Sequence, residues 1–259
     1  MAVILATRNV LLEVGSSSIM VSGPSAPGFA PIDMIQGDLD CAWLADGPSN
    51  VWNIDVRLPP GLPVNFAAIF DVRPLPAAVT LFKSAVWPIT IPSSVASLFM
   101  KAERGDGARL LGGDLGAFAA RFQVTFATPV TPSIGKIWLG VAGSLPGFYL
   151  SRDDAPAFSQ IRNDTETGGS WRHELADMRE RFTLNYNNVT SVTHGSIFDD
   201  WKSSRGGLLP SVLIPDELSP SRAYFGRFEA DLPTALGVKG IRSGLKLPFV
   251  ESGRSIRVG

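Results

Sequence analysis

Two neighbouring segments carry the clearest pattern of apolar and polar positions in the chain. In the first, apolar residues alternate with polar ones at Trp52, Ile54, Val56 and Leu58. This period of two predicts a strand with one buried face. After Pro59-Pro60-Gly61 the chain continues as an almost unbroken apolar run from Val64 to Phe70. Such a run predicts a strand covered on both faces, paired with the first through a Pro/Gly turn.

Shorter patterns predict strands along most of the remaining chain. The segments with apolar alternation or short apolar runs are 3–14, 79–84, 118–126, 133–140, 179–186, 208–216 and 223–230. The spacing of Val192, Ile197, Phe198 and Trp201 predicts one short amphipathic helix. The chain is therefore expected to be all-β or β-rich.

Composition agrees with a folded β-protein. The 259 residues are 45% hydrophobic and 18% charged, with 26 Gly and 20 Pro. The apolar content excludes global disorder. The many Gly and Pro residues suggest turns, and the low charge favours either an all-β protein with long ordered loops or a subunit that buries much of its surface in an assembly.

The charge balance and the single cysteine exclude several functions. With 23 basic and 24 acidic residues the net charge is -1, which does not provide the positive field for direct nucleic-acid binding. Cys41 has no cysteine partner in the chain for a disulfide and no cysteine cluster for zinc. Arg8 interrupts the short apolar start, which argues against a signal peptide, and no run is long enough for membrane insertion.

Three segments resemble galactose-binding-like (discoidin-type) jelly rolls, including versions from tailed-phage virion proteins. They are the strand pair of 51–70, the segment 118–126 and the segment 133–140. The pattern of 171–230 also resembles the C-terminal half of certain phage minor-tail proteins. The resemblance implies a jelly-roll β-sandwich over residues 1–143, followed by a smaller mixed β domain over 144–259 with a short helix and a C-terminal arm.

The resemblance implies a structural component of a tailed bacteriophage virion, in the tail or tail tip. It would act through contacts with other virion proteins and with copies of itself, after synthesis in the host cytoplasm. The alternative is a receptor- or carbohydrate-binding adhesin module that binds a host surface glycan.

Candidate site residues are few, and no catalytic constellation is expected. Calcium is a possible cofactor, because jelly rolls of this class often bind it with Asp and backbone oxygens; Asp33, Asp38 and Asp40 are the candidate ligands. Trp43 and Trp87 lie in loop-like stretches where an exposed ring could contact a sugar or a subunit, but core packing is the favoured interpretation for both. His173 and His194 lack the spacing of a metal motif, and no convergent acids or serine elbow indicate an enzyme.

Overall fold

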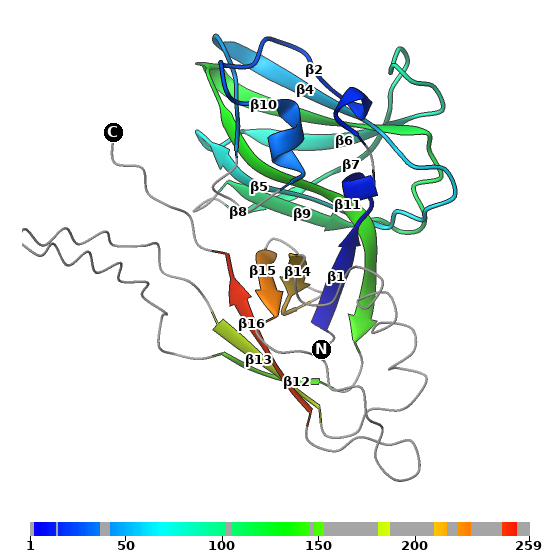
Figure 1. Ribbon diagram of the computed structural model, residues 1–259, viewed down its shortest axis with the longest axis vertical. Helices are drawn as coiled ribbons and strands as arrows, with labels where there is room; N and C mark the ends of the chain where they lie inside the picture. Colours follow the sequence, from blue (N-terminus) through cyan, green and yellow to red (C-terminus); the bar gives the residue numbers. More distant parts are fainter. Residues whose placement is uncertain are drawn as a thin grey trace, which may run out of the picture.

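The computed structural model describes residues 3–13, 15–36, 42–101, 105–145, 148–152, 181–186, 210–216, 222–228 and 245–252. Its strands form two antiparallel sheets (Figure 1). The small sheet has the order β2 (Ile19–Val21), β4 (Ser49–Arg57), β10 (Ala119–Val130), β6 (Ala78–Ser84) and β7 (Ser93–Ser97). None of the described helical segments is long and apolar enough to cross a membrane.

The large sheet contains the remaining described strands. Its order is β12 (Phe148–Arg152), β13 (Arg181–Tyr186), β16 (Leu245–Glu251), β15 (Tyr224–Phe228), β14 (Ser211–Ile214), β1 (Val3–Asn9), β11 (Ser133–Leu145), β5 (Phe66–Arg73), β9 (Asp106–Leu110) and β8 (Phe99–Lys101). The short β3 (Trp43–Leu44) also pairs with β11. Three 3-10 turns complete the described elements: η1 (Val10–Glu13), η2 (Ser16–Ser18) and η3 (Pro31–Met34).

The strand that was predicted to have one buried face is β4, and its residues alternate between buried and more exposed positions as the sequence pattern indicates. Trp52, Ile54 and Val56 are buried in the core between the two sheets. The polar residues between them lie on the outer face, where Asp55 accepts two hydrogen bonds from Arg121 of β10 at 2.6 and 2.7 Å. This hydrogen-bonded carboxylate raises the pKa of the Arg121 guanidinium. The prediction of a β-sandwich strand with one buried face is confirmed.

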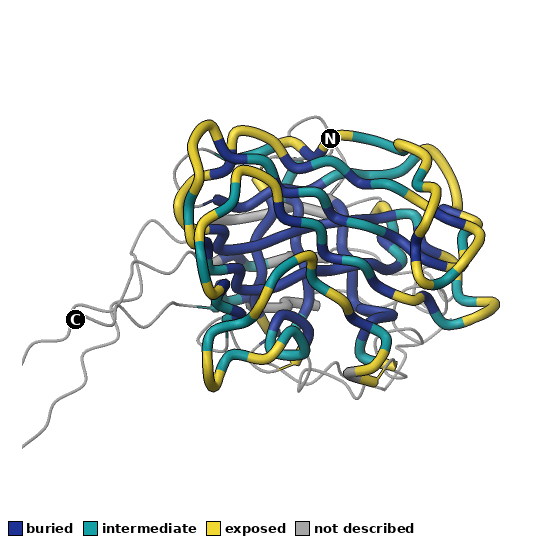
Figure 2. The backbone as a smooth tube through the Cα atoms, turned by 90° about the horizontal axis from the view of Figure 1, so that it is seen from above, coloured by how far each residue is buried: buried dark blue, intermediate teal, exposed yellow. Residues whose placement is uncertain are grey.

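The apolar run after the Pro/Gly turn forms β5, which is buried on both faces. Ala67 and Ile69 belong to the core between the sheets. Phe66, Ala68 and Phe70 belong to a second cluster on the opposite face. In Figure 2 the buried strands run through the middle of the molecule, and exposed residues gather in the loops around them.

The second cluster exists because the large sheet curls back on itself beyond β1. Val212 of β14 and Phe225 of β15 pack against the outer face of β5 and β11, and these strands lie below the sandwich in Figure 1. The Phe225 ring centroid lies 5.3 Å from that of Phe70 and 6.2 Å from that of Trp138. The β-rich class is therefore confirmed for both parts of the chain that the structure describes.

The predicted domain boundary falls within a continuous strand. β11 runs through Gly143 to Leu145, and its pairing with β1 also continues to Leu145. β1 pairs in turn with β14. The division at 143 and 144 stays a prediction, and the predicted helix at 191–201 lies outside the described residues.

Replacing Phe225 by alanine should destabilise the whole chain, because it removes the ring that fills the second cluster. A Phe→Ala change at a fully packed position lowers the free energy of unfolding by about 3–5 kcal/mol, measurable by urea denaturation. Phe99→Ala is the matched control, since Phe99 is 46% exposed, and it should cost about 0.5 kcal/mol. Equal losses in the two variants would contradict the packing described here.

Candidate functional site

Three loops meet at one end of the sandwich. They connect β4 to β5 (58–65), β6 to β7 (85–92) and β9 to β10 (111–118). The strands that carry them are neighbours, because β10 pairs with β4 on one side and with β6 on the other. The antiparallel pairing places Ala119, at the start of β10, opposite Arg57 and Ser84, at the ends of β4 and β6. The three loops therefore lie at the same end of the small sheet.

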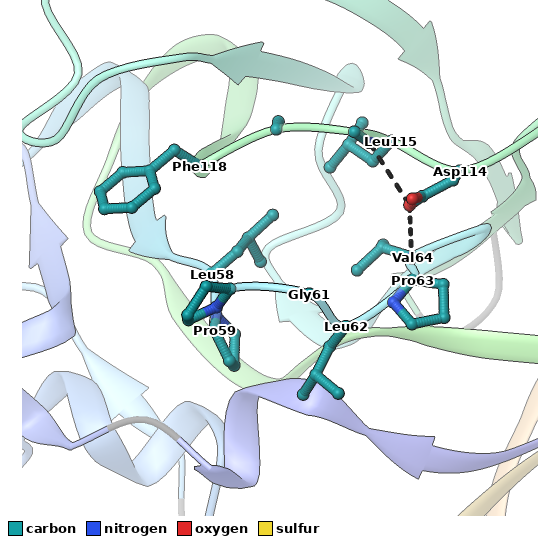
Figure 3. Close-up of a pocket in the computed structure, with 12 residues that line it drawn as sticks. Leu58, Pro59, Gly61, Leu62, Pro63, Val64, Asp114, Leu115 and Phe118 are labelled. Atoms are coloured by element: carbon teal, nitrogen blue, oxygen red, sulfur yellow. Dashed lines mark hydrogen bonds between the residues drawn. The ribbon is translucent and has the colours of Figure 1, made fainter.

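A groove lies between the first and third of these loops (Figure 3). It has a volume of about 360 Å³. Its walls are the residues Leu58, Pro59, Pro60, Gly61, Leu62, Pro63 and Val64 on one side, and Asp114, Leu115, Gly116, Ala117 and Phe118 on the other. Gly61 and Gly116 have φ angles of +76° and +55°, which side chains other than glycine rarely adopt.

Backbone hydrogen bonds join the two walls of the groove. The amide of Leu115 donates to the carbonyl of Val64 at 2.7 Å, and the amide of Leu58 donates to the carbonyl of Phe118 at 2.9 Å. The amide of Phe118 in turn donates to the carbonyl of Ser84 at the end of β6. The shape of the groove is therefore fixed by main-chain contacts between elements far apart in the sequence.

Asp114 adds a side-chain link between the walls. Its Oδ1 accepts hydrogen bonds from the amide of Val64 at 2.8 Å and from the amide of Gly116 at 3.3 Å. These amides favour the carboxylate form, so they hold the pKa of Asp114 below its ordinary value, although partial desolvation opposes them. Of the described residues that line the groove, Asp114 alone is ionisable.

Phe118 forms the rim of the groove on the side of the small sheet. Its side chain is 37% exposed, and the guanidinium carbon of Arg57 lies 5.0 Å from the ring centroid. The ring is an exposed aromatic surface with a cation over one face, on a wall that carries a carboxylate at its other end (Figure 3), so this wall offers both apolar contact and hydrogen bonding. This combination suits a ligand with an apolar face and polar edges.

The two predicted tryptophan sites have different outcomes. Trp87 is half-buried in the loop that joins β6 to β7, at the same end of the sandwich as the groove, but it does not line the groove. Trp43 is fully buried: its Nε1 donates to Ser25 Oγ at 2.7 Å, and its ring meets that of Trp52 edge to face. The favoured interpretation of Trp43 as a core residue is therefore confirmed, and its alternative use as an exposed contact is excluded.

The predicted calcium ligands are only partly described. Asp33 lies in η3, where its Oδ2 accepts a hydrogen bond from the amide of Ala30 at 2.8 Å. Asp38 and Asp40 lie outside the described residues, as do His173 and His194. Within the described ranges, no three His, Cys, Asp or Glu side chains group as metal ligands would.

Sequence reasoning missed Asp114 and Phe118. Phe118 is the first residue of the segment 118–126, whose alternation predicts a strand, so the pattern places it in that strand and not at a site. A signal was present in the loop before it, where one carboxylate stands among Gly112, Gly113 and Gly116. A lone Asp among glycines is a common turn residue, however, and only the pairing of β10 with β4 shows what it faces.

No protein-family model matches the chain, and no curated protein matches it. Similar solved structures include a chitosan-binding module of a chitosanase/glucanase from Paenibacillus sp. IK-5, 17% identical, over 52% of this chain and 99% of that one, with a TM-score of 0.42. CBM32-3, from a family 31 glycoside hydrolase of Clostridium perfringens, is 13% identical over 49% and 93% of the two chains, with a TM-score of 0.39. A pectin-binding carbohydrate-binding module is 17% identical over 48% and 88%, with a TM-score of 0.36.

These three neighbours are carbohydrate-binding modules. At such TM-scores the likeness carries no argument about what this chain binds. None of the three is a virion protein, so the resemblance to phage tail proteins stays a prediction.

The stability of the groove should depend on the ionised form of Asp114. Because its folded pKa is lowered, its contribution is present above the unfolded pKa of about 3.9 and is lost as the pH falls through the folded value. Asp114→Asn should therefore have a slightly lower Tm than the unsubstituted chain at neutral pH, since solvent screens the charge of this exposed carboxylate.

The difference should shrink as the pH is lowered below about 4. Differential scanning fluorimetry at a series of pH values measures it, with Asp46→Asn as a control for an acidic residue in another loop. A difference that stayed constant down to the lowest pH would contradict a role for the charge.

Proposed function

We propose that the chain is a non-catalytic carbohydrate-binding module and that the groove between residues 58–64 and 114–118 is its site. The observation that carries the proposal is the exposed Phe118 ring at the rim, beside the guanidinium of Arg57 and on the wall that also carries the carboxylate of Asp114. A sugar offers an apolar C–H face for the ring and hydroxyl groups for the charged side chains. Small-ligand sites commonly combine such an apolar wall with a few polar groups that fix orientation.

The fixed shape of the groove supports the same proposal. The loops are tied to one another through Leu58, Val64, Asp114, Leu115 and Phe118, so little backbone order has to be gained on binding. A preformed site loses less entropy when it takes up a weakly held ligand. The fold by itself does not imply sugar binding, and the proposal depends on these side chains.

The absence of catalysis is also part of the proposal. Glycoside hydrolysis commonly uses two carboxylates that face each other across the substrate. Among the described residues of the groove wall, Asp114 has no such carboxylate opposite it. Binding, without bond cleavage, is the role that this wall can perform.

A second candidate function is docking as a structural subunit, as in a phage tail or tail tip. It is favoured by exposed apolar side chains in the loop that joins β6 to β7, where Ile91 is 80% and Val86 is 50% exposed. Isolated apolar residues are common on surfaces, but two in one loop beside the half-buried Trp87 fit a protein contact. In this role the chain would be made in the host cytoplasm and built into a virion with copies of itself and other virion proteins.

Phe118→Ala should weaken glycan binding by roughly tenfold or more, since it removes the stacking surface. A glycan array identifies the bound sugar, and isothermal titration then measures the affinity of each variant. Phe99→Ala is a close control: Phe99 is also exposed, and the guanidinium carbon of Arg109 lies 4.7 Å from its ring centroid. Binding that survives Phe118→Ala unchanged, or an array without signal, would overturn the proposal.

Replacing both Val86 and Ile91 by serine tests the docking function. If this loop joins subunits, mass photometry of the unsubstituted chain should show a defined oligomer, and the double variant should dissociate into monomers because the apolar contact is lost. The matched control is Leu75→Ser, an exposed leucine at the opposite end of the sandwich. A chain that is monomeric from the start, or an oligomer unaffected by the change, speaks against docking through this loop.

A further inference from the structure

The groove of the proposed site offers a ligand few hydrogen-bond donors. None of the described side chains that line it can donate, because apart from the carboxylate of Asp114 they are apolar or, in glycine, absent. Some lining residues also lack a backbone N–H, namely Pro59, Pro60 and Pro63. Donors on this surface can therefore come only from the main-chain amides that remain.

The frame of the groove already uses many of these amides. The amides that donate within the frame are those of Leu58, Val64, Leu115, Gly116 and Phe118. Their acceptors are main-chain carbonyls and the carboxylate of Asp114. A ligand in the groove therefore meets a surface that is poor in donors.

Among the described lining residues, Asp114 supplies the only polar side chain. The amides of Val64 and Gly116 both donate to its Oδ1, and its Oδ2 receives no hydrogen bond from a described residue. The two amides also hold the pKa of Asp114 below its ordinary value, so the group is an anion at neutral pH. The groove thus contains one charged oxygen that a ligand can use.

Two cationic side chains lie close to the groove, but neither is among the described residues that line it. The guanidinium of Arg57 lies by the ring of Phe118, at the opposite end of the wall from Asp114 (Figure 3). The Nζ of Lys83 reaches the wall from β6 and donates to the carbonyl of Leu115 at 3.3 Å. The charge that lines the groove is therefore the negative charge of Asp114.

Sugar substituents differ in how well they match such a surface. A hydroxyl group donates one hydrogen bond, but its oxygen also accepts and needs donors in return. A protonated amine donates three hydrogen bonds and accepts none. A carboxylate or sulfate only accepts, and it would also be repelled by Asp114. Of these groups, the protonated amine alone leaves no acceptor of its own unsatisfied beside Asp114.

We propose that the groove binds a basic saccharide, in which the sugar that faces Asp114 carries a protonated primary amine. This inference rests on the proposed carbohydrate-binding function and adds a ligand class to it. The ammonium group donates to Oδ2 of Asp114 in a charge-assisted hydrogen bond, which is stronger than a neutral one. The same carboxylate disfavours acidic saccharides, so one side chain supplies both attraction and rejection.

Matched saccharides test the ligand class on the unsubstituted chain. A glycan array is printed with sets of gluco-, galacto- and manno-configured oligosaccharides that differ only in carrying a free amine, an N-acetylated amine, a hydroxyl or a carboxylate. Within the sets that bind, the free amine should give the strongest signal and the carboxylate the weakest. An N-acetylated, neutral or acidic member that binds as well as the free amine would overturn the ligand class.

Asp114→Asn tests the residue that selects the amine. Asparagine keeps an Oδ1 for the amides of Val64 and Gly116, but it replaces Oδ2 by a donor. By isothermal titration, the affinity for the amine-bearing saccharide should fall roughly threefold to fivefold, the range of an exposed ion pair, while the affinity for its hydroxyl counterpart changes little. Asp46→Asn, in another loop, is the matched control. An unchanged preference for the amine in Asp114→Asn would contradict the proposal.

A measurement on the unsubstituted chain replaces this test if Asp114→Asn does not fold. The ¹³C NMR signal of the Asp114 carboxylate should shift when the amine-bearing saccharide is added, and much less with the N-acetylated one at the same saturation. Equal shifts with the two ligands would show that the carboxylate does not contact the amine.

The ligand class and the proposed function fail in different ways. A neutral or acidic saccharide that binds best, and whose binding is weakened by Phe118→Ala, would overturn the basic ligand and leave the carbohydrate-binding function standing. An array without signal from any saccharide would overturn both.

Discussion

The structure depends on β11, whose backbone needs hydrogen-bond partners along both edges and whose side chains are packed on both faces. The strand runs from Ser133 to Leu145, long enough to serve the sandwich with its first half and the curled part of the sheet with its second. Every unpaired amide or carbonyl in such a buried strand carries a desolvation cost. The chain meets this demand in different ways along one edge: β3 at the start, the side chain of Asn9 in the middle, and β1 at the end.

The same constraint explains the unusual composition of the large sheet. Because β14 and β15 cover its outer face, β5 needs apolar residues at nearly every position, and Phe66, Phe70 and Trp138 are packed on the side that an ordinary sandwich would expose to water. The small sheet has no such cover among the described strands. Its outer face is polar instead, with Asp55 bound to Arg121.

The parts of the fold that local periodicity encodes could be predicted from the sequence. The alternation around Trp52 and the unbroken apolar run that forms β5 each indicated the number of buried faces. Burial that depends on distant partners could not be predicted this way. Trp43 lies in a stretch without a period, and its place in the core comes from contacts with Trp52 and Ser25. A lysine in a strand is expected at the surface, yet Lys136 of β11 is buried. Its Nζ donates to the backbone carbonyls of Asp33 and Gln36, about a hundred positions earlier in the chain.

The groove could not be predicted from the sequence for the same reason, because its two walls, 58–64 and 114–118, come together only when β10 pairs with β4. Its construction has a consequence for how the protein can change. The contacts that hold the walls together are made mainly by main-chain atoms, with Asp114 as the one side-chain link. Side chains at Leu62, Ala117 and Phe118 can therefore be exchanged while the frame persists. Under the proposed carbohydrate-binding function, ligand preference at this end of the sandwich would therefore be free to diversify among related chains without a matching loss of stability.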